Sequence, residues 1–102
     1  MYARLTTVSI HPQKAAEATR IWREEILPIT RTLSGWKGAE LFTNPQTGEG
    51  VAVNFYETEA SVSAVEASGQ FQQLMGKLAP LMTAPPVRKV FEVTGRVETQ
   101  TV

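Results

Sequence analysis

The sequence predicts an α+β domain whose elements follow the order strand, helix, strand, strand, helix, strand. The cluster Asn-Pro-Gln-Thr-Gly-Glu-Gly at residues 44–50 is typical of a turn, and strand-like runs flank it, so residues 35–58 are predicted to form a central β-hairpin. Apolar residues with helical spacing precede this hairpin and follow it. Runs rich in β-branched and aromatic residues occupy both ends of the chain and predict one further strand each.

The composition is that of an ordinary globular protein, and it excludes several kinds of site. A chain of 102 residues is expected to form one domain, over residues 1–102. Ten basic residues balance ten acidic residues, so the charge gives no reason to expect binding to nucleic acid. Without cysteine there are no thiolate sites, and a single histidine, His11, cannot form a multi-histidine metal site. The chain shows neither a signal peptide nor an apolar run of roughly 20 residues, so we expect a cytoplasmic protein that does not enter a membrane.

The first strand is predicted over residues 2–10, and a long helix over residues 13–33. Both faces of the strand carry apolar residues, which is typical of a sheet that is covered on both sides. Pro28 lies inside the helical pattern and is expected to kink or interrupt the helix near residues 24–27, because proline has no N–H to donate. Gly35 suits the position just beyond the helix end.

The hairpin is predicted to contain strands over residues 36–43 and 51–57. Thr58 follows and is a good N-cap for a second helix. Ser68 and Gly69 interrupt this helix, and a helical stripe resumes over residues 71–81.

Prolines at positions 80, 85 and 86 exclude further helix, so the last strand is predicted over residues 87–97 and a frayed tail over residues 98–102. The resulting order is the ferredoxin-like βαββαβ plan, a four-stranded antiparallel sheet with helices on one face. The mixed strand faces indicate that the other face is covered too, and the chain has no spare element to cover it. A second copy of the chain is the simplest cover, so we expect a homodimer that forms through the sheet.

Three stretches carry a resemblance to a known family. They are residues 33–42 (Leu-Ser-Gly-Trp-Lys-Gly-Ala-Glu-Leu-Phe), the turn at 45–48, and residues 53–58 (Val-Asn-Phe-Tyr-Glu-Thr) leading into the second helix. With them, residues 2–97 resemble the antibiotic biosynthesis monooxygenase (ABM) family of the dimeric α+β barrel superfamily. The resemblance implies a dimeric α+β barrel. The superfamily includes cofactor-independent quinone-forming oxygenases, haem-degrading enzymes, isomerases and proteins with no known activity.

Haem degradation is disfavoured, because the residues that such relatives use are missing. Those relatives place an asparagine on the first strand, a tryptophan on the second helical segment and a histidine about one helix further on. Here the first strand has no asparagine, residues 61–68 have no tryptophan, and residues 70–82 have no histidine. Val65 and Met75 are the nearest counterparts. We expect no metal and no cofactor.

The resemblance to oxygenases directs attention to polar residues on the strands. Oxygenation without a cofactor needs a pocket that orients a phenolic substrate and polar groups that stabilise an oxyanion. Asn54 and Tyr56 are the catalytic candidates, since they share a strand face and asparagine is unfavoured in the middle of a strand. The commoner alternative is that Asn54 is hydrogen-bonded to a neighbour or to the dimer partner. The further candidates for lining a pocket are Trp36, Arg4, Trp22, Phe71 and Met75.

Each pocket candidate also has a structural alternative. Trp22 and Met75 lie on apolar helical stripes, where core packing is the more common role. The charged strand residues Arg4, Glu40, Glu92 and Arg96 are expected to form cross-strand pairs at sheet edges or across the dimer. The sequence therefore leaves three functions open, two of them non-catalytic. One is a cofactor-independent monooxygenase acting on a small aromatic or quinol-type substrate in a pocket between sheet and helices. The others are a non-catalytic dimeric protein that binds a small apolar molecule and a dimeric accessory protein.

Overall fold

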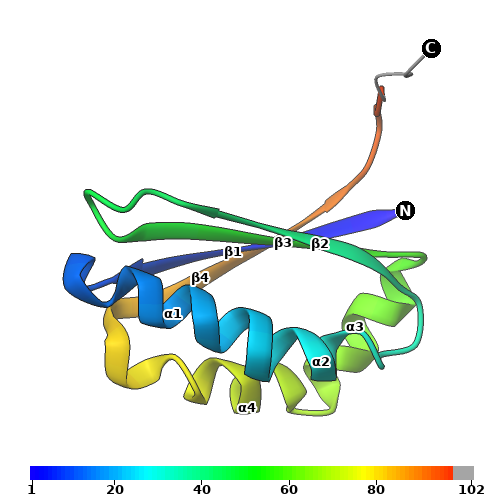
Figure 1. Cartoon of the computed structure of the whole chain (residues 1–102). Coiled ribbons are helices and arrows are strands. Elements are labelled where there is room, and N and C mark those ends of the chain that lie inside the picture. Colours follow the sequence, from blue (N-terminus) through cyan, green and yellow to red (C-terminus); the bar gives the residue numbers. More distant parts are fainter. Residues whose placement is uncertain (98–102) are drawn as a thin grey trace.

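A computed structural model describes residues 1–97 and confirms the α+β, ferredoxin-like fold. All neighbouring strands are antiparallel, in the order β2-β3-β1-β4, and the helices cover one face of the sheet (Figure 1). No helix within these residues is long and apolar enough to cross a membrane. The strands are β1 (Tyr2–Ile10), β2 (Trp36–Thr43), β3 (Glu49–Tyr56) and β4 (Met82–Glu92).

Two groups of helical segments pack on that face. The first group follows β1, and the second joins β3 to β4. The first group consists of η1 (Pro12–Lys14), α1 (Ala15–Ile21), the π-helical η2 (Trp22–Ile26) and α2 (Leu27–Thr30). The second group consists of α3 (Glu59–Ala67), α4 (Gln70–Gly76) and η3 (Ala79–Leu81).

The interruption expected from Pro28 is confirmed, and it takes the form of a π-helical turn. The Leu27 N–H donates to the Trp22 carbonyl, five residues back instead of four. The helix ends at Thr30, so the prediction that it continues to residue 33 was wrong. After Thr30 the backbone tightens into turns with three-residue spacing, in which Leu33 N–H donates to the Thr30 carbonyl.

Gly35 is required where the chain turns from this helix into β2. Its φ is +79°, in the left-handed region, and an added Cβ would lie 2.8 Å from Ser61 Cβ. We expect Gly35→Ala to lower the free energy of unfolding by roughly 3 kcal/mol, from backbone strain together with the clash. Urea unfolding measures this.

The matched control is Gly69→Ala. Gly69 has φ +77°, but a Cβ there would meet no atom of residues 1–97 within 4 Å. Only the backbone strain should remain, at about 1–2 kcal/mol. Equal losses in the two variants would contradict the close packing of Gly35 against α3.

The hairpin turn is shorter than predicted. Asn44 Oδ1 accepts hydrogen bonds from the backbone N–H groups of Gln46 and Thr47, at 3.0 and 3.3 Å. Asn44 N–H then donates to the Glu49 carbonyl, so the strands already pair at that residue. The turn therefore closes by Gly48. The predicted turn over residues 44–50 was wrong at its end, and β3 runs over Glu49–Tyr56 instead of 51–57.

The second helical group begins and breaks where the sequence predicted. Thr58 Oγ1 accepts a hydrogen bond from the Ser61 N–H at 3.1 Å, which confirms the N-cap of α3. The break at Ser68 and Gly69 is confirmed too, because Gly69 adopts the left-handed conformation between α3 and α4.

The predicted position of the last strand was wrong. β4 starts at Met82, passes through Pro85 and Pro86, and ends at Glu92, whereas the sequence predicted residues 87–97. The prolines are tolerated because β4 is an edge strand and because its register with β1 shifts between the pairs Thr7↔Val87 and Ser9↔Ala84. The last register pair between these strands is Tyr2↔Glu92, and after it one more backbone hydrogen bond joins Val93 N–H to the Met1 carbonyl. The predicted tail at 98–102 lies outside the described residues.

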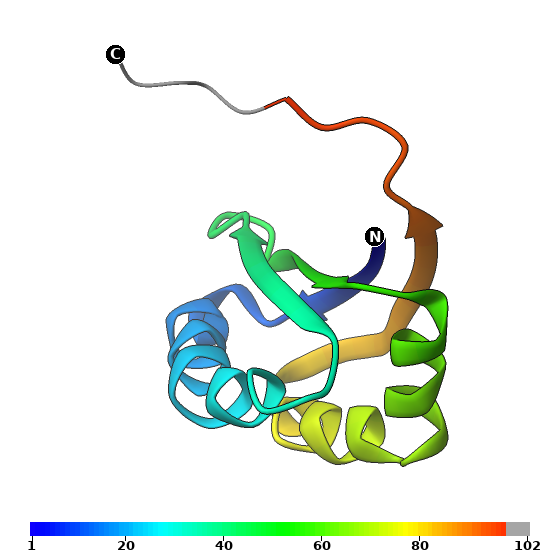
Figure 2. The same cartoon turned by 90° about the vertical axis from the view of Figure 1, so that its right-hand side faces the viewer.

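The face of the sheet away from the helices is open within the described chain, and we call it the open face (Figure 2). Register places Phe42, Thr7 and Val87 in one row across this face, and Phe55, Ala3 and Phe91 in another. The rings of Phe42 and Phe91 are 53% and 52% exposed. The expectation that both faces of the first strand carry apolar residues is also confirmed, with Ala3 and Leu5 on the open face and Val8 and Ile10 facing the helices.

Candidate functional site

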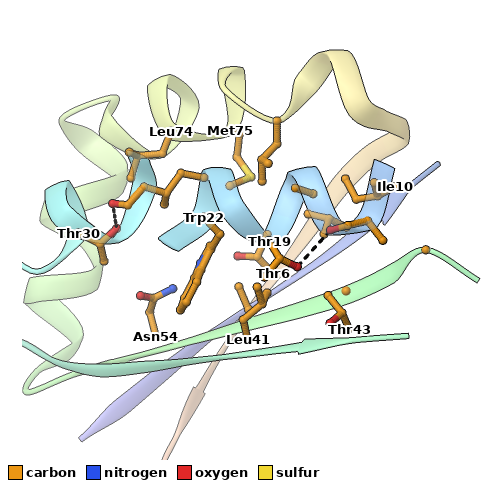
Figure 3. Close-up of a pocket in the computed structure, with 18 of the residues that line it drawn as sticks. Thr6, Ile10, Thr19, Trp22, Thr30, Leu41, Thr43, Asn54, Leu74 and Met75 are labelled. Carbon is orange, nitrogen blue, oxygen red and sulfur yellow. Dashed lines mark hydrogen bonds between the residues drawn. The ribbon is translucent and has the colours of Figure 1, made fainter. Parts of the chain in front are cut away.

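A cavity of about 50 Å³ lies between the sheet and the helices (Figure 3). Several lining side chains project from alternate positions of β1, which face the helices. The helical side of the cavity is contributed by α1, η2 and α4. The lining includes Arg4, Thr6, Val8, Leu41, Asn54, Trp22, Ile26, Phe71, Leu74 and Met75.

Small residues leave this space between the two layers. The helix-facing positions of β3 hold Gly50 and Ala52, and the facing side of α1 holds Ala15 and Ala18. Side chains of this size cannot meet across the gap between a helix and a sheet. Trp22, at the start of the π-helical turn, points from the helix toward the sheet beside Asn54 (Figure 3).

Arg4 is the most unusual residue of the lining, because its side chain is buried at 2% exposure. Its Nη2 donates to Tyr56 Oη at 3.2 Å, and its Cζ lies 4.9 Å from the Phe71 ring centroid and 5.5 Å from that of Tyr56. Arg4 Nε and Nη1 have no hydrogen-bond partner within residues 1–97. The prediction of an edge pair was wrong for Arg4, because β1 lies between β3 and β4 in the middle of the sheet.

The other charged strand residues lie near the surface. Glu92 accepts a hydrogen bond from the hydroxyl of Tyr2, its cross-strand partner, so the predicted edge pair is confirmed there. Arg96 lies beyond the end of β4 at Glu92, so its predicted place on a strand was wrong, and its Cζ lies 5.8 Å from the Phe55 ring centroid. Glu40 is exposed on β2, an edge strand.

Around Arg4 there are two cations, Arg4 and Arg88, and one nearby carboxylate, that of Glu66. Arg88 lies on the neighbouring strand, and its Cζ is 4.2 Å from the Phe71 ring centroid. Glu66 carries the nearby carboxylate, and its oxygen is 3.6 Å from Arg88 Nη1. Burial raises the pKa of the Tyr56 hydroxyl, so this group stays neutral at physiological pH and does not balance Arg4. Burial also lowers the pKa of Arg4, although a guanidinium remains charged in proteins.

The two catalytic candidates share a strand face, as predicted, but only Asn54 lines the cavity. Asn54 Oδ1 accepts a hydrogen bond from Trp36 Nε1 at 3.1 Å. Tyr56 is fully buried beside Val62 and Val65, in a second core cluster against which Trp36 packs. Tyr56 and Trp36 therefore lie behind the lining, where each holds a lining residue in place.

The remaining pocket candidates lie in the lining itself. Trp22, Phe71 and Met75 all border the cavity, and Trp22 and Met75 also pack against the larger core cluster. The sequence reasoning missed Thr6, whose buried Oγ1 has no hydrogen-bond partner within residues 1–97. Strand alternation already placed Thr6 on the face of Arg4, so its hydroxyl could have been identified from the sequence.

Titratable side chains other than Arg4 are absent from the part of the lining that the structure describes. That lining contains neither a carboxylate nor the imidazole of His11. Across residues 1–97, no three His, Asp or Glu side chains are grouped closely enough to hold a metal ion. The described lining is mostly apolar and carries hydrogen-bond donors, and it offers no side chain that would act as a general base at neutral pH.

Solved structures share this fold. A candidate antibiotic biosynthesis monooxygenase from Deinococcus radiodurans has a TM-score of 0.77 and 16% identity, over 99% of this chain and 100% of the other. A monooxygenase from Streptomyces coelicolor (ActVA-Orf6), solved with the ligand nanaomycin D, has a TM-score of 0.74 and 14% identity, over 97% and 92%. NE2512 of Nitrosomonas europaea, a protein of unknown function, has a TM-score of 0.75 and 19% identity, over 98% and 95%.

The TM-scores establish a shared fold, whereas identities this low carry no activity over, so function has to be argued from the site. No protein-family model and no curated protein matches the sequence. The resemblance to antibiotic biosynthesis monooxygenases is thus confirmed for the fold, over nearly the whole chain.

Proposed function

We propose that the protein is a monooxygenase that works without a cofactor and acts on a small aromatic or quinol-type substrate. The observation that carries the proposal is an apolar cavity between sheet and helices with two buried polar side chains, Arg4 and Asn54, on its floor. The fold shared with a monooxygenase that was solved with a ligand supports it. In the overall reaction a phenol and O₂ give a quinone and water, so the substrate itself is the reductant.

The residues of the cavity would then have distinct roles. The apolar walls, with Trp22 and Phe71, would hold the ring. The amide of Asn54 is held by Trp36, and it would donate its free Nδ2–H to the oxygen on which charge develops. Tyr56 would be a positioning residue, since it reaches the cavity only through Arg4.

Oxygen uptake with α-naphthol tests the proposal, because the expected product, a naphthoquinone, is coloured. We expect Asn54→Ala to slow turnover by at least about 100-fold, which is the usual loss for one oxyanion donor. The matched control is Gln73→Ala, which removes an exposed amide on α4 and should leave the rate unchanged.

Other outcomes would favour the alternative function. If the wild-type protein binds α-naphthol but forms no quinone, the monooxygenase proposal is overturned in favour of a non-catalytic binding protein. If turnover occurs and Asn54→Ala leaves the rate unchanged, the role given to Asn54 is wrong.

We further propose that the chain forms a homodimer through the open face. The exposed rings of Phe42 and Phe91 and the exposed Val87 all lie on that face, where a second copy would remove them from water. A two-fold axis can place the same patch of both copies in one contact.

A further inference from the structure

Arg4 is a buried cation with donors that nothing in the described chain uses. Within residues 1–97, two of its three guanidinium nitrogens are buried without a hydrogen-bond partner, and Arg4 is one of the residues that line the cavity. Thr6 is the next residue on the same strand face, borders the same cavity, and has a buried hydroxyl without a partner. Buried polar groups in native proteins are almost always paired, so unpaired groups on one cavity wall indicate a missing ligand.

The surrounding charges do not compensate Arg4. Among residues 1–97, no carboxylate lies within ion-pair distance of its guanidinium, since the neighbouring Glu66 pairs with Arg88. Tyr56 accepts a hydrogen bond from Arg4 but is neutral. The Phe71 ring receives both Arg4 and Arg88, so it cannot offset two cations in full. A buried charge without a counterion is unfavourable, and an anion in the cavity would remove the imbalance.

The rest of the lining points to the form in which such an anion arrives. Neither carboxylate nor imidazole is present in the described lining, so no side chain of this kind can take a proton from a bound phenol or acid. An anionic ligand would therefore have to lose its proton to water before or during binding. Trp22 and Phe71 contribute aromatic faces to the apolar walls next to that charge, and such faces stack on an aromatic ring.

We propose that Arg4 and Thr6 form the binding site for an anionic oxygen on an aromatic ligand, either a phenolate or a carboxylate. That this ligand is the substrate rests on the proposed function, but that the site binds an anion does not. The chemistry needed is one anionic oxygen that accepts from Arg4, with the Thr6 hydroxyl as a second donor.

Equilibrium binding of para-nitrophenol tests the proposal, because its absorption reports how much of the bound ligand is ionised. We expect the wild-type protein to bind the phenolate at least about tenfold more tightly than the neutral methyl ether, para-nitroanisole. The pKa of the bound phenol should fall by about one unit or more for the same reason. The affinity for benzoate is measured against that for benzamide in the same way. The two anion preferences together show whether the site prefers a carboxylate or a phenolate.

Arg4→Met should abolish the preference for the anion and leave the affinity for para-nitroanisole within about twofold. Arg4→Lys should keep part of the preference, because it keeps the charge. If Arg4→Met does not fold, the affinities of the wild-type protein for para-nitrophenolate and para-nitroanisole still test whether the site prefers an anion.

Two results would overturn the proposal. One is that neither phenolate nor benzoate binds more tightly than its neutral partner. The other is that the preference survives in a folded Arg4→Met. Anion binding without quinone formation would contradict the monooxygenase alone, and quinone formation without a preference for the anion would contradict this site alone.

Discussion

The substitution Leu5→Glu is expected to convert the proposed homodimer into a monomer. Leu5 lies in the middle of the open face, where its register partners are Val53 on β3 and Lys89 on β4. In the free chain the new carboxylate would lie next to Lys89 and in contact with water, so the fold should tolerate it. In a sheet-to-sheet interface the same charge would be buried with its copy, and the dissociation constant should rise about 1000-fold or more. Sedimentation over a concentration series measures this.

The matched control is Ile29→Glu. Ile29 is an exposed apolar residue of α2, in the helical layer on the other side of the sheet. This variant should remain a dimer. Dissociation of both variants would place the interface elsewhere, and a monomeric wild-type protein would contradict the proposed dimer altogether.

A double substitution, Arg4→Met with Tyr56→Phe, is expected to be at least as stable as the wild-type protein. Tyr56→Phe alone leaves the third nitrogen of a buried guanidinium without a partner and should cost about 1–3 kcal/mol of unfolding free energy. Arg4→Met alone leaves a fully buried Tyr56 hydroxyl unpaired. Removing both groups leaves an apolar contact and no unpaired polar atom from this pair.

Urea unfolding of the wild-type protein, both single variants and the double variant measures the coupling. We expect the loss in the double variant to be smaller than the sum of the two single losses by at least the roughly 1–3 kcal/mol that Tyr56→Phe alone costs. Additive losses would show that Arg4 and Tyr56 stabilise the fold independently. A double variant that is stable but has lost its affinity for anions would mean that Arg4 is kept for binding and at a cost in stability.

The fold could be predicted from the sequence because its local signals agree with one another. Thr58 caps a helix, Gly69 breaks one, and Pro28 interrupts one, each through a backbone requirement that acts within a few residues. The last strand was misplaced because tolerance of Pro85 and Pro86 depends on β4 being an edge strand. That property belongs to the sheet order and not to the local sequence.

The candidate site could be predicted only in part, for a related reason. Strand alternation placed Asn54 and Tyr56 on one face, but it could not tell that Tyr56 packs into a separate core cluster while Asn54 borders the cavity. Arg4 was named as a pocket candidate, but a pair at a sheet edge or across the dimer was preferred, because a charge in a strand is usually exposed. Its central position, and the absence of a partner for two of its nitrogens within residues 1–97, follow from tertiary packing.

The prolines of β4 also restrict how the protein can aggregate. Pro85 and Pro86 have no N–H, and the register shifts beside them bend the strand, so this border of the sheet is a poor template for another chain. The opposite border, β2 (Trp36–Thr43), contains no proline and keeps its N–H groups. If a strand of another chain adds to this sheet, we therefore expect it to add at the β2 border. A stabilised form for storage would be engineered there, for example with a lysine or a proline in β2.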